Sequence, residues 1–129
     1  MIVIDYSALI CFLLNDPPQR ASALRRRLGA ELLQAPHLLD IEVAHVLRRY
    51  VFTGSLTPSL ASETLAALAR LRVTRHAHYP YLPRIWELRS NLTAYDAAYV
   101  ALAEFLDAPL LTLDGRMARA GAAAKIEVF

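Results

Sequence analysis

Short apolar runs alternate along the chain with longer stretches in which apolar residues recur every three or four positions. The first pattern predicts buried strands and the second predicts helices. The expected strands cover residues 2–4, 32–33, 73–76, 110–113 and 126–129, and Pro36 is expected to end the second one. The expected helices cover residues 7–14, 19–28, 38–52, 57–71, 81–89, 93–107 and 116–120. This alternation predicts an α/β domain with a mostly parallel sheet.

Composition narrows the class of protein. The 129 residues are 56% hydrophobic and 20% charged, which suits one globular domain with one core. No apolar run approaches the roughly 18 residues that a membrane span needs. The apolar start lacks a basic segment and carries Asp5, so it predicts core rather than a signal peptide, and hence a cytoplasmic protein with no membrane partner. Cys11 is the single cysteine and is expected in the core.

Four acidic residues stand where a binding site is expected. Asp5 follows the first strand and Asp114 follows the strand at 110–113. In parallel sheets, ligands bind beyond the carboxyl ends of the strands. Glu42 and Asp96 each lie near the start of a largely apolar helix, so both are expected to face inward or into a cleft. We therefore expect the four carboxylates to converge on one pocket.

Each acid taken singly also has a structural interpretation. Asp5 is a candidate cap for the helix after it, and Asp114 precedes a glycine, as turn and cap residues do. Glu42 lies on a helix that also has a solvated side. Thr93 and Asp96 have the spacing of a capping box, with Thr93 as the N-cap. Any one of these acids, taken alone, does not decide between a structural role and a role in a binding site.

A cluster of four carboxylates has an energetic consequence. Two carboxylates about 5 Å apart repel by about 3 kcal/mol at an effective dielectric constant of 20. Cations offset this repulsion, and hard carboxylate oxygens suit Mg²⁺ or Mn²⁺. With few histidines and no cysteine cluster a zinc site is disfavoured; His76 and His78 are a weak exception.

The net charge of +2 hides an uneven distribution if the four acids share a pocket. The rest of the chain then carries fourteen basic groups and only eight acidic ones. Such a surface favours an anionic partner such as nucleic acid, although genome composition is an equal explanation for the abundant arginine.

Around these acids the sequence resembles a known family. The segments VIDYSAL, IEVAHVLRR, NLTAYDAAYVALAE and PLLTLDGRMARA look like the blocks of PIN-domain ribonucleases. More narrowly, they resemble VapC-type toxins of bacterial toxin–antitoxin pairs. The resemblance covers nearly the whole chain and is closest over residues 81–120.

The resemblance implies a three-layer α/β/α sandwich and a divalent-metal site. It makes Asp5, Glu42, Asp96 and Asp114 the metal ligands, in a catalytic site that hydrolyses RNA phosphodiester bonds and leaves a 5′-phosphate. Ser7 and Thr112 are then expected beside the acids or the substrate. It also implies Mg²⁺, or Mn²⁺, as cofactor, a cognate antitoxin as partner, and a homodimer.

Three positions qualify this expectation. Tyr6 follows the first acid where a small residue is commoner in the family, so its ring either narrows the pocket or turns into the core. Asp40 lies two residues before Glu42 and hence on another side of the helix, so it is not expected as a fifth ligand. Arg116 follows Asp114 closely and is a candidate phosphate contact, with a solvated helix position as the alternative.

Other classes fit less well. An aspartyl phosphotransferase needs a second acid where Ser7 stands, and a receiver domain needs a late lysine at a strand end, whereas the sole Lys125 precedes the last strand. No glycine-rich turn follows the first strand, which disfavours nucleotide-binding loops. The remaining alternatives are a nuclease that acts on DNA and a catalytically silent module that binds a partner.

Overall fold

A single parallel sheet organises the chain. The computed structural model describes residues 1–129 and contains a five-stranded sheet in the order β3-β2-β1-β4-β5. All four strand pairings are parallel. The strands are β1 (Ile2–Ile4), β2 (Leu33–Pro36), β3 (Val73–His76), β4 (Leu110–Thr112) and β5 (Ile126–Val128). The predicted parallel sheet is confirmed.

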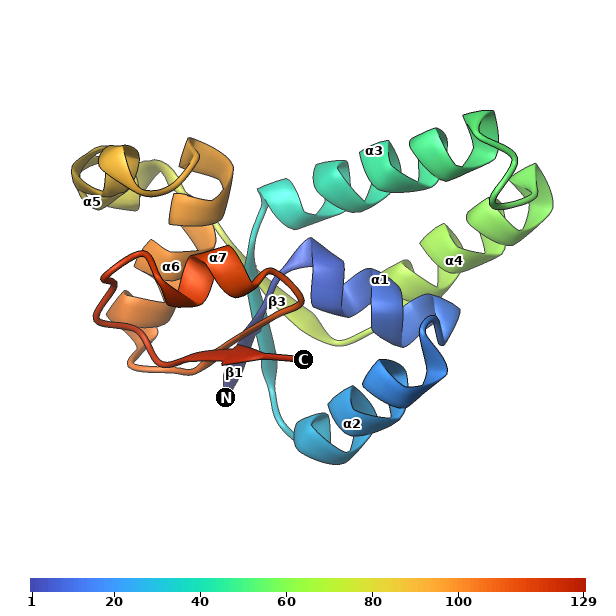
Figure 1. Ribbon diagram of the computed structural model, residues 1–129, viewed down its shortest axis with the longest axis horizontal. Helices are drawn as coiled ribbons and strands as arrows, with labels where there is room; N and C mark the ends of the chain where they lie inside the picture. The colour runs from blue at the N-terminus through green and yellow to red at the C-terminus, as the bar shows by residue number, and fades with distance from the viewer.

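Helices cover both faces of this sheet (Figure 1). Helices α1 and α2 and the long hairpin of α3 and α4 lie on one side, and α5 and α6 lie on the other, which makes the three-layer α/β/α sandwich. The helices are α1 (Tyr6–Leu14), α2 (Pro18–Leu28), α3 (Leu38–Phe52), α4 (Pro58–Arg70), α5 (Leu82–Glu87), α6 (Ala94–Leu106) and α7 (Gly115–Ala118). None of the helices has the length and apolarity that a bilayer crossing requires.

The strand order creates a topological switch point between β1 and β4. From β1 the chain proceeds to β2 and β3 on one side, whereas β4 leads to β5 on the other. Strands β1 and β4 are direct neighbours, with Val3 in register with Leu110. Parallel α/β sheets bind their ligands in the crevice that opens at the carboxyl ends of such a pair. Asp5 and Asp114, which follow these two strands, flank this crevice.

The core explains why α6 is apolar nearly all round. All seven residues from 97 to 103 are buried, because α6 packs against the sheet on one side and is covered by α5 on the other. Strand β1 is fully buried as well, as its continuous apolar sequence predicts. Cys11 is 2% exposed and belongs to the same core, as expected. The acid that follows β1 and the acid in the first turn of α6 are thus attached to the most buried elements of the fold.

Several boundaries differ from the sequence expectation. Strand β2 covers Leu33–Pro36 rather than residues 32–33, and Pro36 is its last residue, as expected, opposite His76 of β3. A proline at a strand end is tolerated because only one ladder hydrogen bond is lost. The helix expected over residues 81–89 is shorter: α5 is flanked by 3₁₀ turns at Tyr79–Tyr81 and Leu88–Ser90. Helix α7 is likewise a single turn from Gly115 to Ala118.

Candidate active site

Asp5 is held rigidly at the end of β1. It is the N-cap of α1, and its Oδ1 accepts hydrogen bonds from the Ala8 amide at 2.9 Å and the Ser7 hydroxyl at 2.7 Å. Its Oδ2 accepts from the Thr112 hydroxyl at 2.5 Å. Asp5 therefore caps α1, as its structural interpretation predicted, and capping is compatible with a role as a metal ligand. With 2% of its surface exposed, Asp5 is the most buried of the four acids.

Two hydroxyl side chains join the ends of β1 and β4. Ser7 Oγ accepts from the Leu113 amide at 2.9 Å, and Thr112 Oγ1 accepts from the Asp114 amide at 2.9 Å. Because both hydroxyls also donate to Asp5, each links that carboxylate to the backbone beyond β4. Ser7 and Thr112 thus lie beside the acids, where the family resemblance placed them.

Asp114 pairs with an arginine two residues later. Its Oδ1 accepts from the Arg116 amide at 2.9 Å, which makes Asp114 the N-cap of α7. The Arg116 guanidinium contacts both carboxylate oxygens, at 3.0 Å from Nε to Oδ1 and 2.7 Å from Nη2 to Oδ2. This contact holds the pKa of Asp114 below its ordinary value. Arg116 is 81% exposed, so its cation lies at the mouth of the site.

Glu42 enters the site from the first turns of α3. Burial raises the pKa of Glu42 to about 7, although the hydrogen bond from Tyr99 acts in the opposite direction and Asp96 and Asp5 add to the rise. The Tyr99 hydroxyl donates to Glu42 Oε1 at 2.7 Å. Tyr99 itself is fully buried in α6, so this bond connects two helices across the site. Glu42 is thus half-buried rather than the solvated helix residue of the alternative interpretation.

Asp96 lies in the first turn of α6, which Thr93 caps. Thr93 Oγ1 accepts from the Asp96 amide at 3.1 Å, as expected for an N-cap. The reciprocal bond of a capping box, from the Thr93 amide to the Asp96 carboxylate, is not formed. Burial raises the pKa of Asp96 above its ordinary value; Asp114 adds to this rise, whereas Thr93 and Arg116 oppose it. Asp96 takes part in none of the ion pairs of this structure.

The four carboxylates share one electrostatic environment. Burial raises the pKa of Asp5 to about 6, with a contribution from Asp96. The pKa of the Tyr6 hydroxyl is raised by burial first and then by the charges of all four acids. The ring of Tyr6 therefore lies within the field of the whole group. These couplings support the expectation that strand ends and helix starts bring the acids into one region, and convergence on a single ion stays a prediction.

The carboxylate oxygens of the site suit a divalent cation, but the side chains are not arranged around a common point. No three acidic, histidine or cysteine side chains are gathered closely enough around one point to hold an ion. Arg116 engages Asp114, and three hydrogen bonds hold the Asp5 carboxylate within the fold. The carboxylates of Asp5, Glu42 and Asp96 have raised pKa values, and Mg²⁺ or Mn²⁺ would stabilise such oxygen donors in the ionised form.

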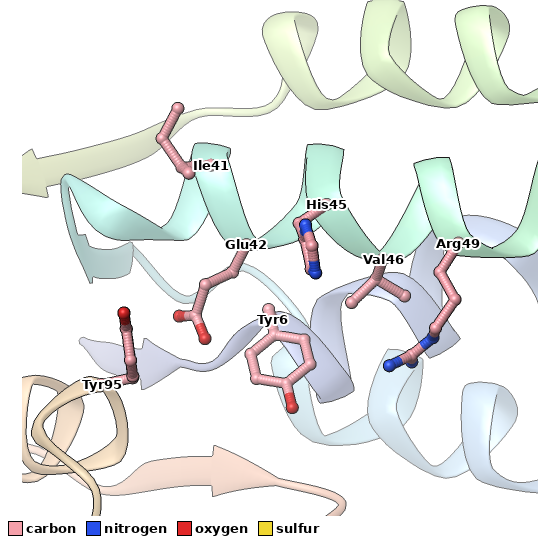
Figure 2. Close-up of a pocket in the computed structure, with 7 residues that line it drawn as sticks. All are labelled: Tyr6, Ile41, Glu42, His45, Val46, Arg49 and Tyr95. Carbon is pink, nitrogen blue, oxygen red and sulfur yellow. The ribbon is translucent and has the colours of Figure 1, made fainter.

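A pocket of about 450 Å³ opens beside Glu42 (Figure 2). Its walls come from α1, α3 and the start of α6, and its lining residues are Tyr6, Ile41, Glu42, His45, Val46, Arg49 and Tyr95. Both interpretations of Tyr6 hold in part, because its ring lines this pocket and also packs against the core. Sequence reasoning did not single out His45, Arg49, Tyr95 or Tyr99. Helical spacing could have indicated three of them. His45 and Arg49 follow Glu42 by three and seven residues, and Tyr99 follows Asp96 by three, so each lies on the same helix face as an acid.

Two further polar positions lie outside the site. Asp40 forms a bidentate pair with Arg75, at 2.8 and 2.9 Å, and so serves to join α3 to β3. His76 Nε2 lies 2.7 Å from Gln34 Oε1, in a hydrogen bond between β3 and β2. Asp40 is therefore occupied by an ion pair and His76 by a hydrogen bond within the sheet.

Comparisons with known proteins agree with this fold and acid pattern. The PIN domain family matches residues 2–123. Ribonuclease VapC9 of Mycobacterium tuberculosis is 44% identical over 123 residues, covering 95% of this chain and 93% of the relative. This relative is therefore matched over almost its whole length.

Solved structures share the fold at lower sequence identity. PAE2754 from Pyrobaculum aerophilum aligns with a TM-score of 0.71 and 24% identity, covering 98% of this chain and 83% of the other. VapC20 of Mycobacterium tuberculosis, a sarcin–ricin loop cleaving toxin, aligns with a TM-score of 0.69 and 18% identity, covering 95% and 97%. The similarity to these two solved structures shows the sandwich fold alone, whereas the match to the family and the 44% identity show family membership. The chain therefore belongs to the PIN-domain family, in its VapC-type ribonuclease branch.

Proposed function

We propose that this protein is a metal-dependent endoribonuclease that acts as the toxin of a toxin–antitoxin pair. The observation that carries the proposal is the acidic crevice at the switch point between β1 and β4, in a chain of the VapC-type branch. Asp5 and Asp114 flank that crevice, and Glu42 and Asp96 enter it from two helices.

Each acid has a distinct task in this proposal. Asp5, Asp96 and Asp114 hold a divalent cation, Mg²⁺ or Mn²⁺, and Glu42 assists directly or through water. When bound, the ion supplies an activated water and offsets the negative charge that develops on the phosphoryl group. Ser7 and Thr112 keep Asp5 aligned with the end of β4. Arg116 is placed to leave Asp114 for a substrate phosphate, because its guanidinium is exposed.

RNA is the substrate we infer. The chain has fourteen basic groups, and only eight acidic groups lie outside the four at the crevice. That excess of positive charge attracts a polyanion toward an acidic centre that would otherwise repel it. The names of the curated relatives point to RNA rather than DNA.

A cognate antitoxin and a second copy of this chain are the partners we infer. A groove of about 530 Å³ between α1, α3 and α4 is lined in part by Leu14, Tyr50, Leu56 and Leu60. A separate apolar surface on α5 and α6 includes Leu82, Trp86 and Phe105, which are 47%, 68% and 70% exposed. Two apolar surfaces of this kind fit a protein partner and a subunit interface.

The test uses the purified chain, total RNA and a divalent metal. We expect cleavage with Mg²⁺ or Mn²⁺, no cleavage after EDTA, and a loss of about a hundredfold or more in Asp96→Asn. Asp107→Asn is the matched control, because Asp107 ends the same helix in a left-handed conformation that asparagine also adopts. Expression of the wild type, but not of Asp96→Asn, should arrest growth.

The same assay separates the alternatives. Equal cleavage by Asp96→Asn, or cleavage that EDTA does not affect, would remove the metal-site assignment. Faster cleavage of single-stranded DNA than of RNA would make the protein a DNA nuclease. No heat of Mn²⁺ binding together with no cleavage would leave a catalytically silent binding module.

A further inference from the structure

One face of α3 continues from the acidic site into the pocket of Figure 2. Glu42, His45 and Arg49 are spaced by three and four residues, so they lie in a row along that face. Tyr6 lies beneath this row, and Tyr95 stands at the end near Glu42. Glu42 belongs to both the acidic site and the pocket. Whatever occupies the pocket therefore lies next to the acidic site.

Two side chains of the lining, His45 and Arg49, have nitrogen donors that form no ion pair, not even with Glu42. Arg49 and His45 form none of the ion pairs of this structure, in contrast to Arg27, Arg75, Arg84 and Arg116. The guanidinium of Arg49 lies 5.8 Å from the ring of Tyr50 and is otherwise directed to the pocket. Such a group is ready to pair with a phosphate without first breaking a salt bridge.

One aromatic side chain of the lining, Tyr95, is largely exposed to solvent. Tyr95 is 65% exposed although it sits in the first turn of a buried helix. Tyr95 lies at one end of the pocket and Arg49 at the other (Figure 2). Proteins hold single-stranded nucleic acid with such a pair, because a base stacks on the ring and the backbone follows the cation. The pocket volume of about 450 Å³ is in the range of about 300–1,000 Å³ of small-ligand sites.

We propose, on the basis of the function proposed above, that this pocket binds an unpaired RNA nucleotide that flanks the cleaved bond. The base stacks on Tyr95 above the floor formed by Tyr6, and the phosphate beyond it pairs with Arg49, with His45 as a second hydrogen-bond partner. The stacking faces of a base are accessible only when it leaves the helix, so the pocket selects single-stranded or bulged RNA. Arg49 and Tyr95 are then specificity determinants outside the acidic centre.

The experiment measures binding without cleavage. Fluorescence anisotropy in EDTA follows labelled twelve-nucleotide oligouridine and oligoadenosine on the full chain. We expect Arg49→Gln to weaken binding about tenfold and to lower the salt slope by about one. Tyr95→Ala should also weaken binding on the order of tenfold, with the salt slope unchanged. In cleavage assays both variants should raise KM while kcat stays within about threefold of the wild type.

Arg48 and Phe52 provide a matched control on the same helix. Arg48 lies over the Phe52 ring at 4.6 Å, and neither residue lines the pocket. Arg48→Gln and Phe52→Ala should therefore leave binding within about twofold of the wild type. Melting temperatures of all four variants verify that the fold is intact.

Each other outcome overturns the proposal. Wild-type binding by Arg49→Gln and Tyr95→Ala, equal losses in the control pair, or no binding of either oligonucleotide by the wild type would remove the nucleotide site. Loss of antitoxin binding with RNA binding intact would make the pocket a protein-docking groove. In all these cases Asp96→Asn still reports separately on the nuclease, because its cleavage defect does not depend on this pocket.

Discussion

The hydroxyl of Tyr99 donates a 2.7 Å hydrogen bond to Oε1 of Glu42, from one helix to another across the acidic site. Tyr99 is fully buried, and burial followed by the charge of Glu42 raises the pKa of its hydroxyl above the ordinary value. The phenol therefore stays protonated and remains a donor at physiological pH. The hydrogen bond from Tyr99 therefore orients the Glu42 carboxylate relative to the other acids.

Replacing Tyr99 with phenylalanine should lower activity more than stability. The ring continues to fill its place in the core, so the free energy of unfolding should fall by only about 1 kcal/mol, the contribution of one hydrogen bond. RNA cleavage should fall about tenfold or more, as is typical when a residue that orients a metal ligand is lost. Single-turnover cleavage and urea unfolding measure the two effects.

Tyr81→Phe is the matched control for this substitution. Tyr81 is half-buried and its hydroxyl forms none of the side-chain hydrogen bonds of the site, although its ring packs 5.3 Å from that of Phe105. Its removal should change neither quantity. An equal loss of activity in both variants, or a loss of stability in Tyr99→Phe that accounts for the lost activity, would contradict the orienting role.

Thr112 should be required for both folding and activity. Its hydroxyl donates to Asp5 Oδ2 and accepts from the Asp114 amide, so Thr112→Val removes two hydrogen bonds and leaves a buried carboxylate oxygen without a donor. We expect a loss of about 2–3 kcal/mol in the free energy of unfolding. Because Asp5 and Asp114 also lose their common link, cleavage should fall at least tenfold.

Thr112→Ser is the rescue variant, because serine keeps the hydroxyl and loses only a methyl group. Most of the stability and the activity should return, as measured by thermal unfolding and RNA cleavage under the same conditions. If Thr112→Val keeps stability and activity while Thr112→Ser loses them, packing of the methyl group rather than the hydrogen bonds explains the residue.

The sequence predicted the sheet because its central strands are buried throughout. Strand β1 is a continuous apolar run followed directly by an acid, and β4 is mostly apolar with an acid two residues beyond it; such runs are typical of central parallel strands. Boundaries were less well predicted where local propensity and tertiary packing compete. Strand β2 continues beyond residue 33 as far as Pro36, because the partner of Pro36, His76, accepts the next amide, that of His37.

The site was predictable as far as strand ends and helix starts locate it. Those positions predicted that Asp5, Asp96 and Asp114 share one region, whereas their role as metal ligands follows from the family resemblance and stays a prediction. The structure adds the caps of the helices at whose starts they lie. The pairing of Tyr99 with Glu42 joins residues 57 apart in sequence, which no local spacing encodes. The contact of Arg116 with Asp114 was also missed, because the rotamer of an exposed arginine depends on the field of the folded acids.

Arg116→Gln should tighten metal binding rather than weaken it. The Arg116 guanidinium contacts both oxygens of Asp114 and so competes with any cation for that carboxylate. Titration calorimetry with Mn²⁺ should give a several-fold lower Kd in the variant. The free energy of unfolding should change by less than about 0.5 kcal/mol, because the ion pair is exposed.

Arg119→Gln is the control, since Arg119 acts on Asp114 only at a distance. Its Mn²⁺ affinity should stay close to that of the wild type. An unchanged or weaker affinity in Arg116→Gln would mean that the guanidinium does not compete with the ion.

The metal-free protein should lose stability as the pH rises from about 4 to about 7. Burial raises the pKa of Asp5 from 3.8 to about 6 and that of Glu42 from 4.5 to about 7. Between these values the folded chain holds more protons than the unfolded chain, so raising the pH favours unfolding. For Asp5 the full effect is about 3 kcal/mol at most. The lowered pKa of Asp114 acts only below about pH 4, outside this window.

Urea unfolding in EDTA at several pH values from 4.5 to 8 measures this slope. Glu42→Gln should show a flatter dependence, since one of the two titrating carboxylates is gone while the amide oxygen can still accept from Tyr99. Saturating Mn²⁺ should restore stability more at pH 8 than at pH 5, because an ion binds only the ionised carboxylates. Stability that is flat or rises with pH in the metal-free protein would show that neighbouring positive charge already neutralises these acids, and the crevice would then have little need of a cation.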